Sequence, residues 1–196
     1  TATVAGLVPV PPNNTTTFLR GDATFAAPAA GGFTLGTEQS ITSGTSITFG
    51  SIPAGTRMIV VSIARASSNG TSAWIIQLGD AGGLETTGYT GTGAQILSTA
   101  ASTVGTGAGF AFNTAPVAAE SYSGSLILTL ENSTLFRWCA TGCLSSNGDS
   151  GNSVSYVGGS KELTQELTQL RFQAANGTDA FDSAANISGI NIAYIS

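Results

Sequence analysis

Short runs in which apolar and polar residues alternate fill the chain from Phe33 onward, and this pattern predicts β-strands. In Ser121–Asn132, for example, the leucines at 126, 128 and 130 fall on one face of a strand. Successive side chains of a strand point to opposite faces, so such a run has one face for a core. The pattern predicts strands at Ser46–Ile52, Arg57–Ser67, Ser72–Asp80, Gly88–Leu97, Gly109–Phe112, Ser121–Asn132, Thr134–Gly142, Ser153–Gly159, Thr168–Ala175 and Ile187–Ile195.

Turn signals separate these runs. Three Asn-Gly dipeptides, which reach positive φ at little cost and commonly form hairpin turns, stand at 69–70, 147–148 and 176–177. Many short strands at this spacing predict an all-β fold, an antiparallel β-sandwich over residues 33–196. The one helical candidate, Ser160–Leu170, is either one or two turns of helix or the lead-in to the following strand.

Residues 1–32 have a different pattern and predict an extended N-terminal arm. Prolines fix φ and donate no N–H, which favours polyproline-like backbone. The arm is too apolar for a solvated linker, so we expect it to pack against its own copies in a trimeric stalk. The prolines are Pro9, Pro11, Pro12 and Pro28, and the apolar anchors are Leu7, Val8, Val10, Phe18, Leu19 and Phe25.

The amino-acid composition favours some classes of binding partner and argues against others. Only 9% of the 196 residues are charged, against roughly 25% in an ordinary soluble domain, and Thr, Ser, Asn and Gly replace them. Such a surface suits permanent subunit packing or hydrogen bonding to neutral sugars. The net charge of −5 with six scattered Lys and Arg argues against nucleic-acid binding. We also expect no membrane insertion and no signal peptide, and because the sequence starts at Thr1 we expect a fragment of a longer protein.

The chemistry of the side chains predicts a protein that is not an enzyme and holds no cofactor. There is no His, so a Ser or Cys nucleophile lacks its usual base. The carboxylate pairs Asp80/Glu85 and Asp179/Asp182 could in principle cleave glycosides, but each fits a turn better. Calcium at Asp80, Glu85 or Asp149 has no spacing signature, and we expect no metal site.

The two cysteines, Cys139 and Cys143, are interpreted as free thiols. A small disulfide loop bent at Gly142 is the alternative, since the sequence does not give the geometry that a disulfide requires. As metal ligands the pair is weak, because no second pair and no His completes a tetrahedral shell.

Candidate receptor contacts lie near loops. Trp74 and Trp138 fall within apolar strands and are expected in the core or a subunit interface, whereas tyrosines among small polar residues suit a contact surface. The loop Leu144–Ser153 is too polar to build a core, so it is a connector or a recognition loop. The predicted contacts are Tyr156, Tyr89, Asn147, Asp149 and Asn152.

The stretch AGLVPVPPNNTTTFLRGDATFAAP resembles a motif of phage tail fibre and tail-tip proteins, G-L-V-P-x-P, a polar spacer, then F-L-R-x-D-G-T-W. Ala23 and Phe25 depart from it, standing where Gly and Trp are usual. In this motif Arg20 and Asp22 are expected to make inter-chain or turn hydrogen bonds, which also accounts for the RGD tripeptide. The matching positions are Gly6, Leu7, Val8, Pro9, Pro11, Phe18, Leu19, Arg20, Asp22 and Thr24.

The end of the chain, from Asn176 to Ser196, is similar to the terminal strand of phage fibre-tip β-sandwich domains. The two resemblances imply a jelly-roll-like, homotrimeric tip of a phage tail fibre, made in the host bacterial cytoplasm and incorporated in the virion. They imply that it contacts other virion tail proteins and adsorbs to a host-surface polysaccharide or protein. The alternative is a purely structural virion component, such as a head fibre, decoration or baseplate protein; an enzyme comes third.

Overall fold

The computed structural model describes residues 17–21, 24–27, 32–97, 100–105, 107–112, 117–118, 120–147 and 152–196. The chain divides into two compact units, Thr1–Gly32 and Phe33–Ser196. In the described residues of both units the regular elements are strands, and no helix there is long and apolar enough to cross a membrane.

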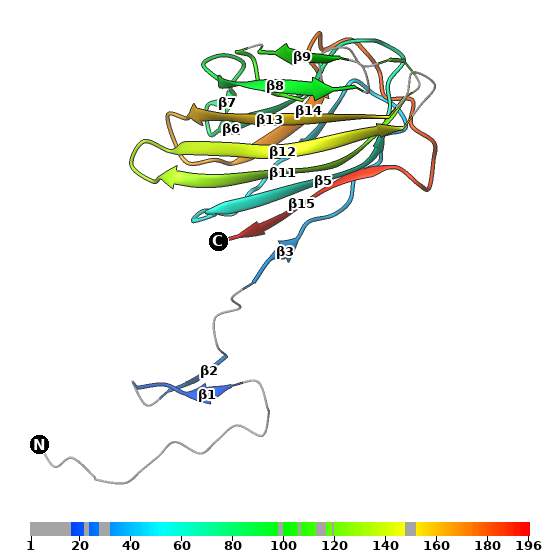
Figure 1. Ribbon diagram of the computed structural model, residues 1–196. Helices are drawn as coiled ribbons and strands as arrows, with labels where there is room; N and C mark the ends of the chain where they lie inside the picture. Colours follow the sequence, from blue (N-terminus) through cyan, green and yellow to red (C-terminus); the bar gives the residue numbers. More distant parts are fainter. Residues whose placement is uncertain are drawn as a thin grey trace, which may run out of the picture. The chain divides into compact units, whose positions relative to one another are not determined.

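The larger unit contains an eight-stranded antiparallel sheet (Figure 1). Its centre is a meander of three long neighbouring strands, which bury alternate side chains on one face. In spatial order the strands are β3 (Thr34–Leu35), β15 (Gly189–Ile195), β5 (Met58–Ala66), β11 (Ser121–Asn132), β12 (Arg137–Asn147), β13 (Ser153–Glu162), β8 (Thr90–Ile96) and β9 (Ala101–Val104).

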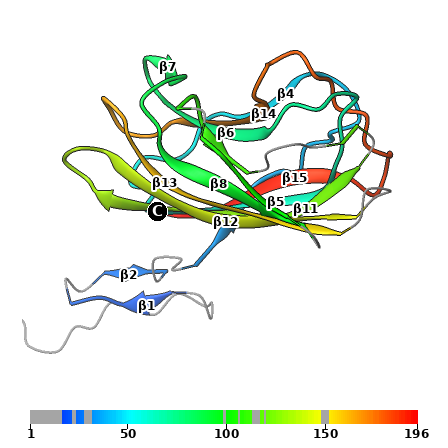
Figure 2. The same cartoon turned by 45° about the horizontal axis from the view of Figure 1, so that its top comes forward.

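A second antiparallel sheet lies over the buried face of the first, as Figure 2 shows. The chain passes repeatedly between the layers: β5 is followed by β6, and β13 by β14. Neither sheet closes into a barrel, so the predicted all-β antiparallel sandwich is confirmed. The strands of the second sheet are β10 (Phe110–Ala111), β6 (Trp74–Asp80), β14 (Gln169–Ala174) and β4 (Ser46–Phe49), with β7 (Gly83–Leu84) paired to β6.

The core between the layers is aromatic and aliphatic. Trp74 stacks on Phe172 at 4.9 Å and on Phe181 at 5.5 Å between ring centroids. Leu126 and Trp138 from the larger sheet are also buried, so the interior position expected for both tryptophans is confirmed.

Most predicted strands match, and the differences have physical reasons. The predicted loop Leu144–Ser153 began too early, because β12 continues to Asn147; β13 begins at Ser153, where the predicted strand Ser153–Gly159 begins. Leu144 is buried in the core, and the Ser146 and Ser153 hydroxyls bond to each other at 2.8 Å, so a Ser-rich run is satisfied inside the sheet.

The helical candidate Ser160–Leu170 contains no helix. β13 continues to Glu162, and the segment after it returns to the second sheet as β14. The lead-in to a strand, the other interpretation, is therefore correct. The Asn176-Gly177 turn is present, with Gly177 at φ +70°, but it connects the two layers instead of forming a hairpin.

In the N-terminal unit, β1 (Phe18–Leu19) pairs with β2 (Phe25–Ala26), and Arg20 N–H donates to the Thr24 carbonyl at 2.7 Å. This hairpin replaces the extended backbone predicted for the stretch. Phe18 is 60% and Leu19 47% exposed, and Phe25 is half-buried. The other arm positions, Leu7, Val8, Pro9, Pro11 and Asp22, lie outside the described residues.

Candidate functional site

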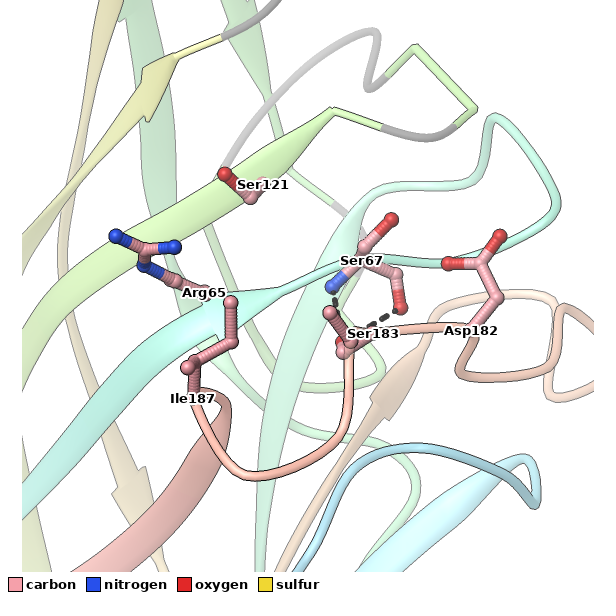
Figure 3. A pocket seen from close by; sticks show the side chains of 7 residues that line it. Arg65, Ser67, Ser121, Asp182, Ser183 and Ile187 are labelled. Atoms are coloured by element: carbon pink, nitrogen blue, oxygen red, sulfur yellow. Dashed lines mark hydrogen bonds between the residues drawn. The ribbon is translucent and has the colours of Figure 1, made fainter.

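A polar hollow of about 300 Å³ lies at the end of the sandwich where β5 ends and β11 begins. Figure 3 shows Arg65 and Asp182 at opposite sides of this group, with Ser67 and Ser183 between them. We call it the Arg65 hollow; Ser121, Ala184 and Ile187 complete its lining.

Arg65 occupies an unusual backbone position. The pairing of β5 with β11 shifts register there, so that Ala64 and Arg65 both lie opposite Ser123, which is a β-bulge. Arg65 has φ +53°, and its N–H donates to the Ser123 hydroxyl at 2.9 Å. A non-glycine residue in this region costs roughly 1–2 kcal/mol. Such strain is concentrated at functional sites, because it aims a side chain in a direction that a regular strand does not allow.

The opposite wall is held by the segment that follows β14. Phe181 is buried against Trp74, and this anchor leaves the next residue, Asp182, exposed. Ser67 N–H donates to the Ser183 hydroxyl at 2.8 Å, and Asp182 N–H donates to the Ser67 carbonyl at 3.3 Å. These two hydrogen bonds fix the position of the wall, and they leave the Asp182 carboxylate exposed to solvent.

The hollow combines one cation, one anion and hydroxyl groups. In the described part of the chain no carboxylate forms an ion pair with Arg65. A guanidinium donates, a carboxylate accepts and a serine hydroxyl does both, so the lining can serve the mixed donors and acceptors of a polyhydroxylated ligand.

A second hollow, of about 330 Å³, lies at the same end, where β12 meets β13. Asn152, a predicted contact, lines it together with Ser145, Ser146, Ser153 and Val154. Of the two other predicted contacts in this loop, Asn147 ends β12 opposite Ser121, and Asp149 lies outside the described residues.

Beneath the second hollow, buried polar groups tie the strand ends together. Gln95 donates to the Ser153 hydroxyl at 2.9 Å, which links β8 to β13. The Tyr122 hydroxyl donates to the Glu120 carboxylate at 2.8 Å, and both side chains are buried. These bonds hold the loop end of the larger sheet in a fixed arrangement.

Tyr89 does not lie where the sequence suggested. It is 7% exposed, and its hydroxyl accepts from Leu78 N–H at 2.6 Å and donates to the Glu85 carbonyl at 3.0 Å. Its ring packs edge-on against the ring of Phe110, with 5.1 Å between the ring centroids. Burial raises the pKa of Tyr89 well above its ordinary value. Tyr89 is therefore a core residue and not a surface contact.

Tyr156 is half exposed, but on the outer face of the larger sheet and not at the loop end. The register aligns it across the strands with Cys143 and Ala94. Two neighbouring cross-strand rows contain no charged residue; we call them the neutral outer face. They are Asn191, Ser62, Ser125, Cys143, Tyr156 and Ala94, and Ala193, Val60, Ile127, Thr141, Gly158 and Thr92.

Three of the four carboxylates weighed for catalysis have structural partners, and the fourth, Asp182, is exposed. Glu85 pairs with Lys161 at 3.4 Å, and Asp179 accepts from Ser72 N–H at 3.0 Å and from the Asn176 amide at 2.6 Å. Asp80 is buried and fully hydrogen-bonded. Among the described residues, no group of three or more His, Cys, Asp or Glu could hold a metal ion.

The sequence offered no signal for Arg65, because the bulge depends on the partner strand, and it indicated only a turn for Asp182. Scanning the chain against protein-family models, and searching curated proteins and solved structures, found no match.

Proposed function

We propose that this chain is the receptor-binding tip of a phage tail fibre and that the loop end of its sandwich binds a host-surface polysaccharide. The observation that carries the proposal is the Arg65 hollow, whose lining combines an arginine with a strained backbone, a solvent-exposed carboxylate and serine hydroxyls. The motif resemblance of the first 28 residues gives the biological setting.

The residues of the hollow favour a glycan over a flat protein surface. Its lining is polar and slightly concave, and its two charges are of opposite sign. Neutral sugars present many hydroxyls and few apolar groups, so short, fixed polar side chains complement them at little cost in side-chain entropy. The second hollow beside Asn152 extends the same kind of surface along the end of the sheet.

The test is binding of the purified, fluorescently labelled protein to a panel of bacterial strains and to their extracted surface polysaccharides. We expect labelling of a subset of strains and competition with adsorption of a phage that infects them. Arg65→Gln and Asp182→Asn should each reduce binding about tenfold, because each leaves a ligand group unpaired. Arg137→Gln is the matched control: Arg137 starts β12 at the other end of the sandwich and lines neither hollow, so this variant should bind as the parent does.

A structural virion component is the second candidate, and the neutral outer face favours it. The centres of protein interfaces lack charged residues, and Tyr is enriched there. We propose homotrimer formation through this face and through Phe18 and Leu19, which are exposed in the single chain. Failure to label any strain, together with a stable trimer in analytical ultracentrifugation, would favour the structural role; a stable monomer at micromolar concentration would argue against both the trimer and the fibre.

A further inference from the structure

The Arg65 hollow adjoins another hollow of about 320 Å³, and the two share the lining residue Ile187. We call this neighbour the Glu38 hollow. Each hollow alone is near the lower limit of ligand pockets, which have volumes of roughly 300–1,000 Å³, whereas the two together are well within that range. Besides Ile187 and Ala64, the lining of the Glu38 hollow consists of Glu38, Ser40, Asn186, Ser188 and Gly189.

The β-bulge in β5 brings the two hollows together. In a regular strand Ala64 and Arg65 would point to opposite faces, but here both are exposed. Arg65 lines one hollow and Ala64 lines the other. Ala64 pairs with Gly189 of β15, so the Glu38 hollow continues from the bulge across the neighbouring strand.

Hydrogen bonds fix the walls of the Glu38 hollow. Gln39 and Ile190 exchange two backbone hydrogen bonds, of 2.9 and 3.0 Å, and Ile190 is buried in the core. The Ser188 hydroxyl donates to the Ala184 carbonyl at 2.6 Å, which closes the turn that contains Ile187. A site that is fixed before binding loses little conformational entropy when a ligand arrives.

The two hollows repeat the same kind of polar group. Each contains serines and one exposed carboxylate, Glu38 in one hollow and Asp182 in the other. The ion pairs between described residues include neither of these carboxylates. The Glu38 carboxylate packs directly over Gly189, where a Cβ would overlap it. A carboxylate has two acceptor oxygens, so each can accept from adjacent hydroxyls of a sugar.

Ile187 separates these polar groups. Its side chain is 53% exposed and lies beside Arg65 in Figure 3. A sugar has hydroxyls at its rim and apolar C–H groups on its ring faces, so an exposed aliphatic side chain can pack against a ring while the polar groups bind hydroxyls. Polar groups repeated on both sides of an apolar residue match a ligand built of repeated units.

We infer that the Arg65 and Glu38 hollows form one groove that binds at least two consecutive sugars of a polysaccharide chain, one in each hollow, across Ile187. The inference rests on the proposed function, in which the Arg65 hollow binds a host-surface polysaccharide. It adds that the ligand is a segment of the chain and not a single sugar.

The length of the ligand is tested with fragments of the polysaccharide extracted from a strain that the protein labels. Partial acid hydrolysis and size fractionation give the monosaccharides and oligosaccharides of up to about six sugars. Each fraction competes with binding of the labelled full chain to the intact polysaccharide. Oligosaccharides that fill both hollows should compete about tenfold better than the monosaccharides or more, because both sets of contacts contribute. Equal competition by the monosaccharides overturns the inference.

Variants then test the second half of the groove. Glu38→Gln and Ile187→Ala alter exposed side chains, and each should weaken the affinity for the oligosaccharides about threefold or more. The matched controls are Glu131→Gln in β11 and Leu135→Ala in the turn after it, which also alter exposed side chains and should bind as the parent does.

Arg65→Gln separates this inference from the proposed function. If Arg65→Gln weakens binding of the polysaccharide while Glu38→Gln and Ile187→Ala do not, the groove is overturned and the Arg65 hollow remains a binding site. If the parent protein labels no strain and binds no extracted polysaccharide, the proposed function fails and the groove fails with it.

Discussion

Asp80 and Thr164 are 84 residues apart in the chain, yet the Asp80 carboxylate accepts both the backbone N–H of Thr164, at 3.2 Å, and its hydroxyl, at 2.7 Å. It also accepts from Gln165 N–H at 3.1 Å and Gly82 N–H at 2.8 Å. One buried side chain thus joins the end of β6 to the segment between β13 and β14.

We expect Asp80→Asn to lower the free energy of unfolding by about 2–3 kcal/mol, because an amide offers one acceptor oxygen and turns a donor toward the N–H groups. Urea unfolding at pH 7 measures the loss. Asp182→Asn is the control: this exposed carboxylate should change stability by no more than about 0.5 kcal/mol.

The Asp80 carboxylate should also make the free energy of unfolding depend on pH. Burial raises its pKa, but the hydrogen bonds from Thr164, Gly82 and Gln165 lower it by more, so the folded-state pKa lies below the ordinary value. Its stabilising effect is therefore complete above the unfolded-state pKa of about 4 and is lost as the pH falls through the folded-state pKa. The difference between the parent and Asp80→Asn should narrow below about pH 4. A constant difference down to pH 2 would contradict this assignment.

At Gly93 the two sheets approach so closely that there is no room for a side chain. A Cβ at this position would overlap the carbonyl oxygens of Ala111 and Phe112, which belong to backbone that cannot easily move. We expect Gly93→Ala to cost about 1–3 kcal/mol in thermal or urea unfolding. Gly50→Ala is the matched control, since a Cβ there meets nothing and φ is not positive; it should be neutral or slightly stabilising.

Removing either member of the Lys161–Glu85 ion pair should lower the stability of the fold, and the two losses should differ. The Lys161 ammonium is buried, 3.4 Å from Glu85 and 5.5 Å from the centre of the Tyr89 ring. Glu85→Gln leaves this charge unpaired and should cost about 2 kcal/mol, less than in a wholly buried pair because Glu85 is partly exposed. Lys161→Met removes the charge itself and should cost less. The order of the two melting temperatures checks this, and the reverse order would show that the pair itself provides the stability.

Cys139 and Cys143 are both free, as predicted. They lie four residues apart in one strand, hence about 13 Å, whereas a disulfide requires Cα atoms within about 7 Å. We expect two free thiols in the unreduced protein and faster alkylation of the exposed Cys143 than of the half-buried Cys139. Mass spectrometry of the intact protein and its peptides measures both. If the neutral outer face packs in the proposed trimer, Cys143 should be protected until the trimer is dissociated.

The sequence predicted the sandwich because alternation is a local property of each strand. It identified β11 to its exact ends, for example, from leucines two residues apart. It misplaced the end of β12, because serines such as Ser146 resemble loop residues until a partner strand supplies the second hydroxyl. The tertiary contact, and not the composition of the segment, decides the structure there.

The candidate site was harder to predict for a related reason. The sequence neighbours of Tyr89 are small and polar, yet its side chain is buried in the core, where it contacts Leu78, Glu85 and Phe110. Arg65 lies inside an apparently regular strand, and only its pairing with β11 shows the bulge that aims it. Both cases depend on which strands become neighbours, and residue order alone does not give this.

The meander of β11, β12 and β13 also bears on how the domain acquires its structure. These strands pair with neighbours close in sequence, whereas β5 pairs with β15 across more than a hundred residues, as in Ile63 with Ile190. Closing a long loop costs entropy before any contact repays it, so local hairpins form sooner. We therefore expect the three-stranded meander to act as the folding nucleus, and its amides to be the earliest protected from hydrogen exchange during refolding.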